Sequence, residues 1–449
     1  MSDPDANPKL AYERPDDQRP SSAAAPPPEI LQPHPVRHDP YAALRFRDFR
    51  LYLLGWIVSV IGSQILEVAV GWDLYQRTKN PLSLAWVGLV SALPIILLAL
   101  PAGHLADLID RRRIMITTGA LTTLCAVALG LLSYSSGPLW AIYTILFLAA
   151  VAKAIGWPAR SALVPSLVPS QSFANAIAWN TTAFQTAAMT GPALGGIIIA
   201  WNTTVPYFIT AFTSLIFIAT IIPIKKRPAP TRREPATLKS LAAGVKFVID
   251  NQIILAIITL DLFAVLLGGA TYILPIFATD ILHVGARGFG WLRASPALGS
   301  LLGAIAVAHL PPMKRAGRAL LLAVFGFGIA TIIFGLSRNF WLSLAMLFLT
   351  GVFDNVSVVV RHTLVQVLTP DSMRGRVSAV NNIFVGASNE LGGFESGVTA
   401  RFFGPIISVV AGGIGTLIVV MLSAVIWPQV AKFGSLVDAQ PTPENKAAG

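Results

Sequence analysis

The chain has little charge and almost no cysteine, and each shortage excludes a class of protein. Only 12% of its 449 residues are charged, whereas an average soluble domain carries about 25%. Cys125 is the single cysteine, which excludes an internal disulfide and a thiolate metal cluster. The sequence also lacks a GxxxxGK[ST] phosphate loop and any Ser-His-Asp or His/Cys constellation within a span. An ATP-driven pump and a membrane-embedded enzyme are therefore disfavoured, and no cofactor or metal is predicted.

Apolar side chains are abundant instead, at 54% of the residues. A water-soluble fold cannot bury that much apolar surface, and the charges are concentrated between long apolar runs. Residues 1–44 are rich in Pro, Ala, Asp and Ser and lack the apolar core of a signal peptide, so we expect a disordered cytoplasmic tail there. The composition is that of a multi-pass protein embedded in a lipid bilayer.

The formal net charge of +11 raises nucleic-acid binding as an alternative. Lys and Arg occur mainly in alternate loops between apolar runs, as the positive-inside rule expects. No basic face with interleaved aromatic residues is present. Nucleic-acid binding is therefore not predicted, and the basic loops are assigned to membrane orientation.

Twelve apolar stretches are about 20 residues long, which is the length that crosses a hydrocarbon core of roughly 30 Å. They predict an all-α membrane protein with twelve transmembrane helices. The predicted spans are 51–73, 84–106, 114–134, 139–158, 173–200, 205–224, 252–275, 288–310, 319–337, 341–362, 377–402 and 404–427.

The distribution of basic residues places both termini in the cytoplasm. Arginines precede the first span and follow the second, and the longest internal loop carries a further basic group, whereas the connections SYSSGP and WNTTVP on the other side carry no charge. Arg77, Lys79 and Arg287 are exceptions on the outer side. The basic residues that set the orientation are Arg45, Arg47, Arg50, Arg111, Arg112, Arg113, Lys225, Lys226, Arg227, Arg232, Arg233 and Lys239.

The chain also resembles itself at an offset of about 200 residues. RSALVPSLVPSQSFANAIAWN in the first half aligns with RHTLVQVLTPDSMRGRVSAVN in the second. A shared offset indicates an internal duplication. We expect two parallel six-helix halves at 45–224 and 251–430, joined by a cytoplasmic linker at 225–250 and followed by a cytoplasmic tail at 431–449. The paired positions are Leu163 with Leu364, Pro169 with Pro370, Asn180 with Asn381, Gly88 with Gly290, Pro94 with Pro296, and Arg113 with Arg315.

The loop after the second span contains GHLADLIDRRR, residues 103–113. Gly103 allows two helices to approach closely, and Asp107 can pair with an arginine or a helix N-terminus at the membrane edge. An ordinary stop-transfer loop would explain the arginines but not the spacing of the Gly and the Asp. The loop resembles the G-x-L-A-D-x-x-x-R-R/K motif of the major facilitator superfamily, whose fold has two parallel six-span halves. The matching residues are Gly103, Leu105, Ala106, Asp107, Arg111 and Arg112.

This resemblance implies that the loop clamps one conformational state, with Asp107 and Arg111 in that role. The equivalent loop of the second half, VAHLPPMKRAGR, keeps its basic residues but has His309 in place of the Asp. Over nearly the whole membrane region the chain is similar to the bacterial enterobactin exporter and macrolide-efflux-like subfamily. ATLKSLAAGVKFV in the linker and the long fifth and eleventh spans carry that similarity. It implies a location in the bacterial plasma (inner) membrane.

The fifth span contains TGPALGGI, in which three glycines and a proline permit close packing and a bend. A purely structural kink is the alternative, because Gly and Pro are common in membrane helices. The run resembles the G-x-x-x-G-P-x-x-G-G antiporter motif of exporters in the superfamily, with Ala187 in place of the first Gly. The matching residues are Gly191, Pro192, Gly195 and Gly196.

Ionisable residues inside the spans are candidate proton or substrate sites, because an unpaired charge there is costly. Glu67 shares a face with Gln64 and Gly71, and we expect this stripe to face a central cavity. Glu390 and Glu395 lie on neighbouring faces of the eleventh span. The full set of candidates is Gln64, Glu67, Lys153, Asp261, Arg293, Asp354, Glu390 and Glu395. Four other charges lie near span ends, where contact with the interface explains them: Asp73, Arg160, Arg361 and Arg401.

We expect one or more of these acids, chiefly Glu67 or Glu395, to bind and release a proton during transport. The physical reason is that a carboxyl group removed from water holds its proton more strongly. The alternative for each acid is a static pair with Lys153 or Arg293, or a buried neutral carboxyl that holds helices together.

These patterns predict a secondary active transporter and not an enzyme. The preferred interpretation is a proton-coupled exporter of a small hydrophobic or amphipathic molecule, such as a siderophore, drug or metabolite, working by alternating access. An importer or lysolipid transporter of the same fold is one alternative, and a non-transporting membrane receptor or scaffold is another. The expected partners are a small-molecule substrate, protons and the lipid bilayer, with no oligomeric state indicated.

Overall fold

The computed structural model describes residues 39–225, 238–309 and 313–434, and every regular element within these ranges is a helix. Most of the predicted tails (1–38 and 435–449) and the first part of the basic linker (226–237) lie outside the described residues, as do residues 310–312. The long helices of the first half are α1 (Arg47–Thr78), α2 (Pro81–Leu108), α3 (Arg111–Tyr134), α4 (Leu139–Leu163), α5 (Phe173–Trp201) and α6 (Val205–Ile221).

The helices that follow belong to the second half and to the segment before it. The longer ones are α7 (Leu238–Asp250), α8 (Gln252–Leu267), α10 (Gly285–His309), α11 (Ala316–Leu336), α12 (Phe340–Leu368), α13 (Asp371–Phe403) and α14 (Pro405–Ile426). The short elements of the whole chain are η1 (Ala42–Arg45), η2 (Val164–Leu167), η3 (Ser170–Ser172), η4 (Ala270–Ile273), α9 (Leu274–Ile276), η5 (Phe277–Ile281) and α15 (Pro428–Lys432).

Twelve of these helices coincide with the twelve predicted spans, namely α1–α6, α8 and α10–α14. Ten helical segments are long and apolar enough to cross a membrane. The other two are α6, which is apolar but shorter, and α13, which carries acidic and basic residues along its length. The predicted all-α fold with twelve transmembrane helices is confirmed.

The seventh span is interrupted, although its apolar sequence predicted one continuous stretch at 252–275. Helix α8 ends where the Gly268 N–H donates to the Ala264 carbonyl at 2.9 Å. Gly269 then lies against α13 so closely that a Cβ there would come within 2.5 Å of the Gly392 carbonyl oxygen. Two successive glycines therefore end the helix and allow the chain to pass over α13 as η4.

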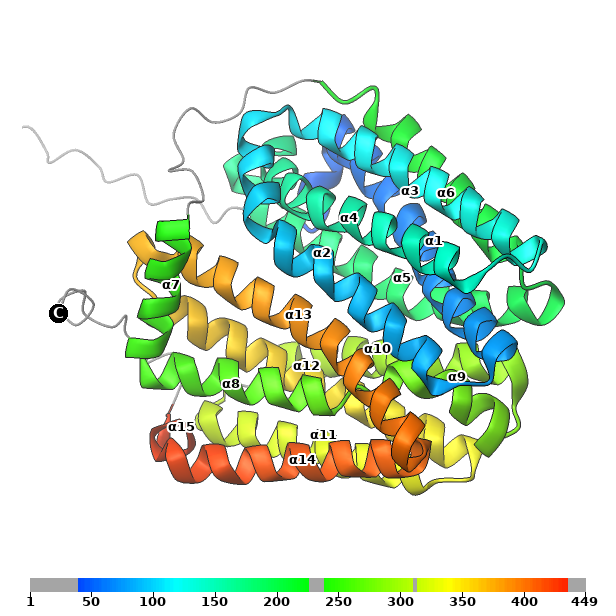
Figure 1. The fold of residues 1–449 in the computed structure, drawn as a ribbon. Helices are drawn as coiled ribbons and strands as arrows, with labels where there is room; N and C mark the ends of the chain where they lie inside the picture. The colour runs from blue at the N-terminus through cyan, green and yellow to red at the C-terminus, as the bar shows by residue number, and fades with distance from the viewer. Residues whose placement is uncertain (1–38, 226–237, 310–312, 435–449) are drawn as a thin grey trace, which may run out of the picture. The chain divides into compact units, whose positions relative to one another are not determined.

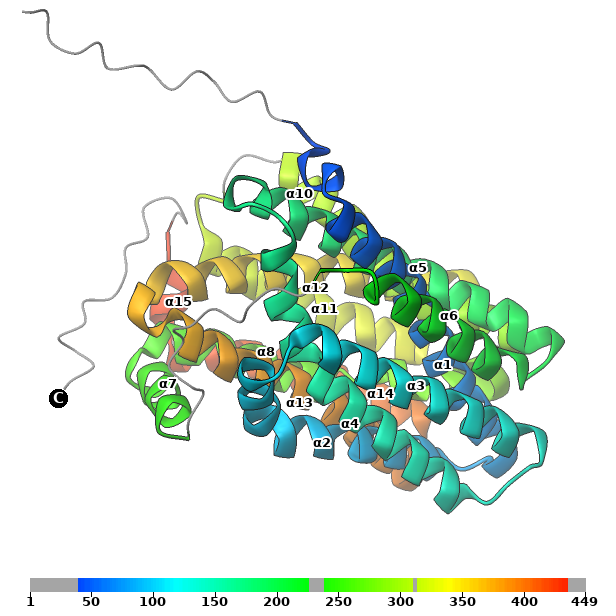
Figure 2. The same ribbon diagram turned by 90° about the horizontal axis from the view of Figure 1, so that it is seen from above.

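The two halves repeat one packing pattern. In the first half α1 packs against α5 and α6, α2 against α4, and α3 against α4 and α6. In the second half α8 packs against α13 and α14, α10 against α12, and α11 against α12 and α14. Each second-half pair is the counterpart of a first-half pair, as the internal duplication predicts. Figures 1 and 2 show the two groups of helices meeting where α2 lies along α13 and α5 along α10.

The two halves meet along α5 with α10 and along α2 with α13, and we call these two contacts the seams. Both are backbone-to-backbone contacts at glycine. A Cβ on Gly196 of α5 would lie 2.7 Å from the Gly290 Cα of α10. On the other seam, a Cβ on Gly88 of α2 would lie 2.5 Å from the Glu390 carbonyl oxygen of α13. Gly88 and Gly290 are paired positions in the sequence repeat, so the duplication supplies one close-approach glycine to each seam.

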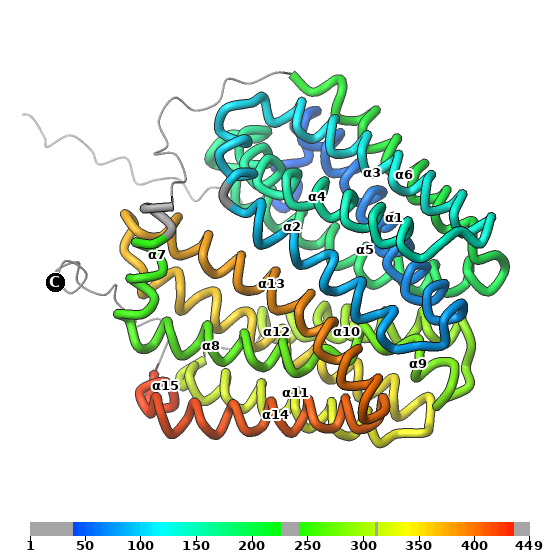
Figure 3. The backbone as a smooth tube through the Cα atoms, in the orientation of Figure 1, coloured from blue at the N-terminus to red at the C-terminus, as the bar shows by residue number. Residues whose placement is uncertain are grey.

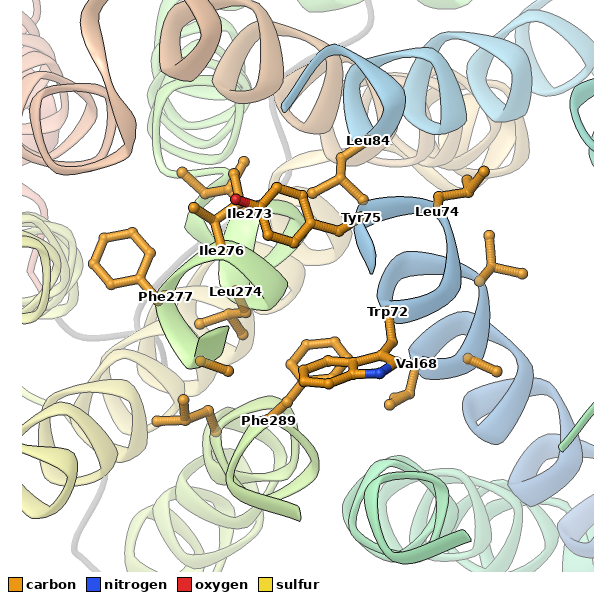
Figure 4. Packing of buried hydrophobic residues seen from close by; sticks show 14 of the residues in the cluster. Val68, Trp72, Leu74, Tyr75, Leu84, Ile273, Leu274, Ile276, Phe277 and Phe289 are labelled. Atoms are coloured by element: carbon orange, nitrogen blue, oxygen red, sulfur yellow. The ribbon is translucent and has the colours of Figure 1, made fainter. Parts of the chain in front are cut away.

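The buried apolar side chains form one core that is common to both halves at one end of the bundle. There Trp72 of α1 stacks on Phe289 of α10 with ring centroids 5.7 Å apart (Figure 4). Val68 of α1 and the segment Ile273–Phe277 of the second half complete the centre of this core. We call this end of the bundle the joined end.

At the opposite end, which we call the separated end, each half has its own core. One contains Phe49, Ile114 and other residues of the first half, and the other contains Phe247, Leu364 and other residues of the second half. Since no buried cluster joins the halves there among the described residues, the structure is closed by apolar packing at the joined end.

Helix α7 lies at the separated end beside the first turns of α13 (Figure 3). It falls within the segment predicted as a linker, and Phe247 and Val248 form its buried side. Gly244 permits the contact, because a Cβ there would lie 3.0 Å from the Arg376 carbonyl oxygen. The linker thus ends in an amphipathic helix that is attached to the second half.

A bulky side chain at the α5–α10 seam should open the joined end. Gly196→Leu would force the two backbones apart, and overpacking of this kind costs about 1–3 kcal/mol, which is roughly a 5- to 150-fold shift against the closed arrangement. The measurement uses a Cys125→Ser background with Ser91→Cys, a position on α2 that lines a cavity just beyond the common core. A membrane-impermeant maleimide is added to each side of the membrane in turn, and labelling from the side of the joined end should increase.

The matched control is Gly375→Leu, because Gly375 is exposed and a Cβ there meets nothing within 4 Å. Equal labelling of the Gly196 and Gly375 variants from the side of the joined end would show that the glycine contact does not hold this end closed.

Candidate functional site

Two acids and two bases meet between the halves, just beyond the core of the joined end. Glu67 of α1 and Lys153 of α4 come from the first half, where Lys153 Nζ lies 3.8 Å from Glu67 Oε1. Arg293 of α10 and Glu390 of α13 come from the second half. Lys153 Nζ also lies 3.8 Å from Glu390 Oε1, and Arg293 Nη2 lies 3.4 Å from Glu67 Oε2. Two of the three ion pairs therefore cross from one half to the other.

The broken seventh span supplies two further groups to this cluster. The Tyr272 hydroxyl donates to Glu390 Oε2 at 2.5 Å, and Arg293 Nη1 donates to the Thr271 carbonyl at 3.2 Å. Tyr272 reaches this position because Gly393 of α13 has no side chain, and its ring lies 2.6 Å from the place a Cβ would occupy there. The break after α8 and Gly393 of α13 therefore serve the site as well as the fold.

The four charges differ in their access to water. The side chains of Lys153 and Glu67 are 57% and 43% exposed, whereas those of Arg293 and Glu390 are 22% and 12% exposed. All four line one cavity of about 120 Å³, together with apolar residues of α1, α2, α4 and α10. Since the formal charges sum to zero, the cluster is neutral as a unit, and its Glu67 and Lys153 side chains are more exposed than those of Glu390 and Arg293.

The residues of the predicted polar stripe on α1 lie in two different places, the cavity and the contact with α5. Glu67 and Gly71 line the cavity, as expected. Gln64 instead packs against α5, where a Cβ on Gly191 would lie 2.5 Å from the Gln64 Cβ.

On α13 the carboxylate that joins the cluster is that of Glu390. Glu395 accepts hydrogen bonds from Thr399 at 2.8 Å and Ser396 at 3.4 Å, within its own helix.

The remaining acids lie in the second half and have different surroundings. Asp261 of α8 forms a buried ion pair with Arg361 of α12, whose side chain is only 4% exposed. Sequence position near a span end did not indicate this burial of Arg361. Asp354 of α12 lines a larger cavity of about 290 Å³ and has no ion-pair or hydrogen-bond partner within the described residues.

Two other charges near span ends also have specific partners. Arg77 pairs with Asp73 at 2.8 Å and donates to the Ser133 carbonyl at 2.9 Å, at the C-terminal end of α3. Contact with the carbonyls at a helix C-terminus is favourable for a basic side chain. Arg160 lies over Trp56, with the guanidinium carbon 3.8 Å from the ring centroid.

The residues of the predicted gate motif join α3 to its neighbours at the separated end. The side chain of Arg111 donates to the Ala162 carbonyl at 3.0 Å, and that of Arg112 donates to the Ile222 carbonyl. Asp107 is partly buried at the end of α2, close to Gly103, and forms no ion pair with the described residues. The arginines thus bind the ends of α4 and α6.

The four residues of the predicted antiporter motif are all buried in α5. Gly191 and Gly195 face α1, where a Cβ on Gly195 would lie 3.3 Å from the Val68 Cβ. Gly196 faces α10 across the seam. The motif therefore lies where α5 contacts a helix of its own half and one of the other half.

No group of three or more His, Cys, Asp or Glu side chains suited to a metal occurs within the described residues.

Sequence reasoning did not identify Tyr272, Thr271 or the buried role of Arg361. The paired glycines at 268–269 are the one local signal for the first two, because they mark a break in an otherwise apolar run. Nothing in the local sequence signals the pairing of Arg361 with Asp261, which are a hundred positions apart.

The chain matches the family model of transmembrane secretion effectors over residues 38–445. It belongs to this family of the major facilitator superfamily. The predicted resemblance is confirmed, and the chain is a multi-span membrane transporter of a non-enzymatic family. Sequence relatives include the enterobactin exporter EntS of Escherichia coli O1:K1 and that of Shigella boydii serotype 18. Each is 24% identical over 391 residues, which are 86% of this chain and 93% of the relative.

Solved structures with the same fold are transporters of the superfamily. A mutant of the peptide transporter POT superposes with a TM-score of 0.71 at 11% identity, covering 86% of this chain and 95% of that one. A bacterial homolog of the human lysosomal transporter Spinster, in an inward-facing and unoccupied conformation, superposes with a TM-score of 0.64 at 15% identity, covering 88% and 98%. At these identities the likeness establishes the fold alone.

Removing one partner of the buried pair between α8 and α12 should destabilise the protein strongly. Asp261→Asn leaves the Arg361 guanidinium uncompensated, and breaking a buried pair in this way costs about 3–5 kcal/mol. The double variant Asp261→Leu with Arg361→Met should recover much of the loss, because it leaves no buried charge. The measurement is the midpoint temperature of unfolding of the detergent-solubilised protein, followed by size-exclusion chromatography after heating.

The control is Asp371→Asn, which removes an exposed pair with Arg374 whose two side chains are 87% and 49% exposed. Such surface pairs contribute little, so its midpoint should not change. A double variant as unstable as Asp261→Asn would contradict the assignment of a compensating ion pair.

Proposed function

We propose that the chain is a proton-coupled exporter of a small hydrophobic or amphipathic molecule, and that it works by alternating access. The observation that carries the proposal is the neutral cluster of Glu67, Lys153, Arg293 and Glu390 at the boundary of the two halves. We further propose that these residues, and not Glu395, carry the coupled proton.

The cluster links proton binding to the position of the halves. Both ion pairs across the boundary, Lys153 with Glu390 and Arg293 with Glu67, hold the halves together at the joined end. A proton on either acid removes one of these attractions, so the closed arrangement loses stability relative to the arrangement that is open at the joined end. A proton can drive a conformational change only through such a difference in affinity between two states.

The more exposed and the more covered side of the cluster suggest an order of events. The exposed Glu67 exchanges its proton with water in the cavity, whereas the covered Glu390 is held by Tyr272 as well as by Lys153. Lys153 contacts both acids and stabilises whichever carboxylate is charged. A proton that reaches Glu67 therefore changes the balance of the whole cluster.

The proposed orientation assigns each end of the bundle to one side of the membrane. Arg47, Arg50 and Arg111 lie at the separated end, beside the first-half core, and the positive-inside rule assigns such an end to the cytoplasm. In this proposal the described state is open to the cytoplasm and both termini are cytoplasmic, in a bacterial inner membrane. The segments 45–224 and 251–430 are the two moving bodies. Similarity to proteins named as enterobactin exporters supports export.

The two sequence motifs take complementary roles in this cycle. Gly196 and its neighbours in α5 stabilise the state closed at the joined end, because they allow α5 to touch α10. Asp107 and Arg111 act at the opposite end and clamp the other state, which agrees with the absence of an ion pair at Asp107 among the described residues here.

The test is proton movement in inside-out vesicles with an acidic lumen. A panel of siderophores, macrolides and amphipathic dyes is added, and lumenal pH is followed with a fluorescent probe. An exported compound entering the lumen should release protons to the medium and raise the lumenal pH. Glu67→Gln and Glu390→Gln should each reduce this response at least tenfold, because each substitution removes a carboxyl group that takes part in the exchange of protons for substrate.

The matched control is Glu395→Gln, an acid on the same helix as Glu390 that hydrogen-bonds only within α13. It should retain the response. Loss of proton movement in Glu395→Gln with retention in the two cluster variants would contradict the assignment of the site. Absence of proton movement for every compound, with the folded protein present, would contradict proton-coupled export.

A further inference from the structure

A second cavity lies beside the ion cluster in the second half, and its charge is not balanced. It has a volume of about 290 Å³ and is formed mainly by α8, η4, α10, α11 and α12. Asp354 of α12 is its only acidic lining residue, and no Lys or Arg is found among the described residues that line it. The Asp354 carboxylate also forms no ion pair or hydrogen bond with the described residues. A lone carboxylate in a membrane-spanning helix is costly unless something compensates it.

The nearest basic residue on the same helix cannot supply that compensation. Arg361 lies two turns beyond Asp354 on one face of α12, but its guanidinium is already paired with Asp261. A small side cavity of about 20 Å³ is lined by both Asp261 and Asp354, so the acidic character extends toward α8. No base among the described residues is placed to compensate Asp354, so a cation that enters the cavity would be stabilised by its carboxylate.

The polar groups around the cavity present acceptors more than donors. The hydroxyls of Thr331 and Thr350 each donate to a carbonyl of their own helix, at 2.8 Å and 2.6 Å, which leaves their lone pairs free to face a ligand. An acceptor-rich wall around a carboxylate suits a cation and disfavours an anion.

Aromatic rings complete the wall and distinguish an organic cation from a metal ion. Phe327, Phe334 and Tyr272 all line the cavity. The faces of such rings attract ammonium groups, and quaternary ammonium ligands are commonly held this way. A volume near 290 Å³ is far larger than a bare ion requires and approaches the lower range of small-molecule pockets.

We propose that this cavity binds the cationic head of the transported molecule, with Asp354 as its counter-ion, so that the substrates are organic cations such as aryl or alkyl ammonium compounds. This inference rests on the proposed transport function and names the substrate class of the same central cavity. The two cavities share Thr271 and Tyr272 in their walls. The remaining apolar part of the substrate can therefore extend toward the cavity of the ion cluster.

The shared wall also gives a physical reason for exchange of substrate with protons. Tyr272 lies between the cation site and Glu390, to which its hydroxyl donates. A positive charge arriving at Asp354 disfavours a second positive charge nearby, so the bound cation and the cluster proton destabilise one another. Binding of the substrate thus favours release of the proton.

The test compares an organic cation with its neutral carbon isostere. Phenyltrimethylammonium and tert-butylbenzene have the same shape and differ in one atom at the branch point, and both are small enough for the cavity. Binding to the full-length protein in detergent is measured by isothermal titration calorimetry. The parent should bind the cation at least tenfold more tightly than the isostere. Asp354→Asn should weaken binding of the cation at least tenfold and leave binding of the isostere unchanged.

The control Asp371→Asn removes an exposed acid and should leave both affinities unchanged. The comparison within the parent protein decides the inference even where Asp354→Asn fails to fold: equal affinity for cation and isostere would overturn it. Equal weakening of both ligands by Asp354→Asn would also overturn it, since that would indicate damage to the cavity in place of lost charge.

The outcome is separable from that of the proton measurement, because binding in detergent needs no gradient. If neutral amphipathic compounds drive proton movement and the protein binds the cation no more tightly than its isostere, the proposed cation site is contradicted but proton-coupled export is not. If cation binding depends on Asp354 and no compound drives proton movement, the proposed proton coupling is contradicted but the proposed cation site is supported.

Discussion

Four charges compensate one another at the boundary of the two halves, and the packing of the helices around them has to bring all four together. A charge within a membrane-spanning bundle is tolerated only when a partner or water reaches it. Here the partners come from α1, α4, α10 and α13, and most of the attraction crosses between the halves. In the proposed cycle, a change of charge in the cluster therefore acts on the relative position of the halves.

Close packing of the helices at the two seams allows the four charges to approach one another. Ion pairs of 3.4–3.8 Å between helices of different halves require backbones that approach closely, and glycine at the contact permits that approach. Gly88 rests on the carbonyl of Glu390 itself, so one seam directly positions an acid of the cluster. Because Gly88 and Gly290 are repeat-related, gene duplication explains why two equivalent seams exist on either side of the cluster.

The distinction between Glu390 and Glu395 illustrates how strictly helix rotation selects functional groups. Five residues along an α-helix correspond to a turn of about 140°, so two acids on α13 cannot face the same cavity. The sequence-based prediction favoured Glu395, but the face of α13 that meets the first half is set by Gly88 and Tyr272. The acid on that face is Glu390.

The sequence by itself determined the class, the number of spans, the duplication and the family, because apolar run length, loop charge and short motifs are local properties of the chain. It also named all four members of the ion cluster, since an ionisable residue in an apolar run stands out without any structure. Which charges meet was decided only by the tertiary structure. Glu67 and Glu390 lie on helices more than 300 positions apart, and their contact depends on the rotation and crossing of four helices. Those angles follow from close contacts at glycine between helices that are distant in sequence, and no local pattern specifies which helices meet there.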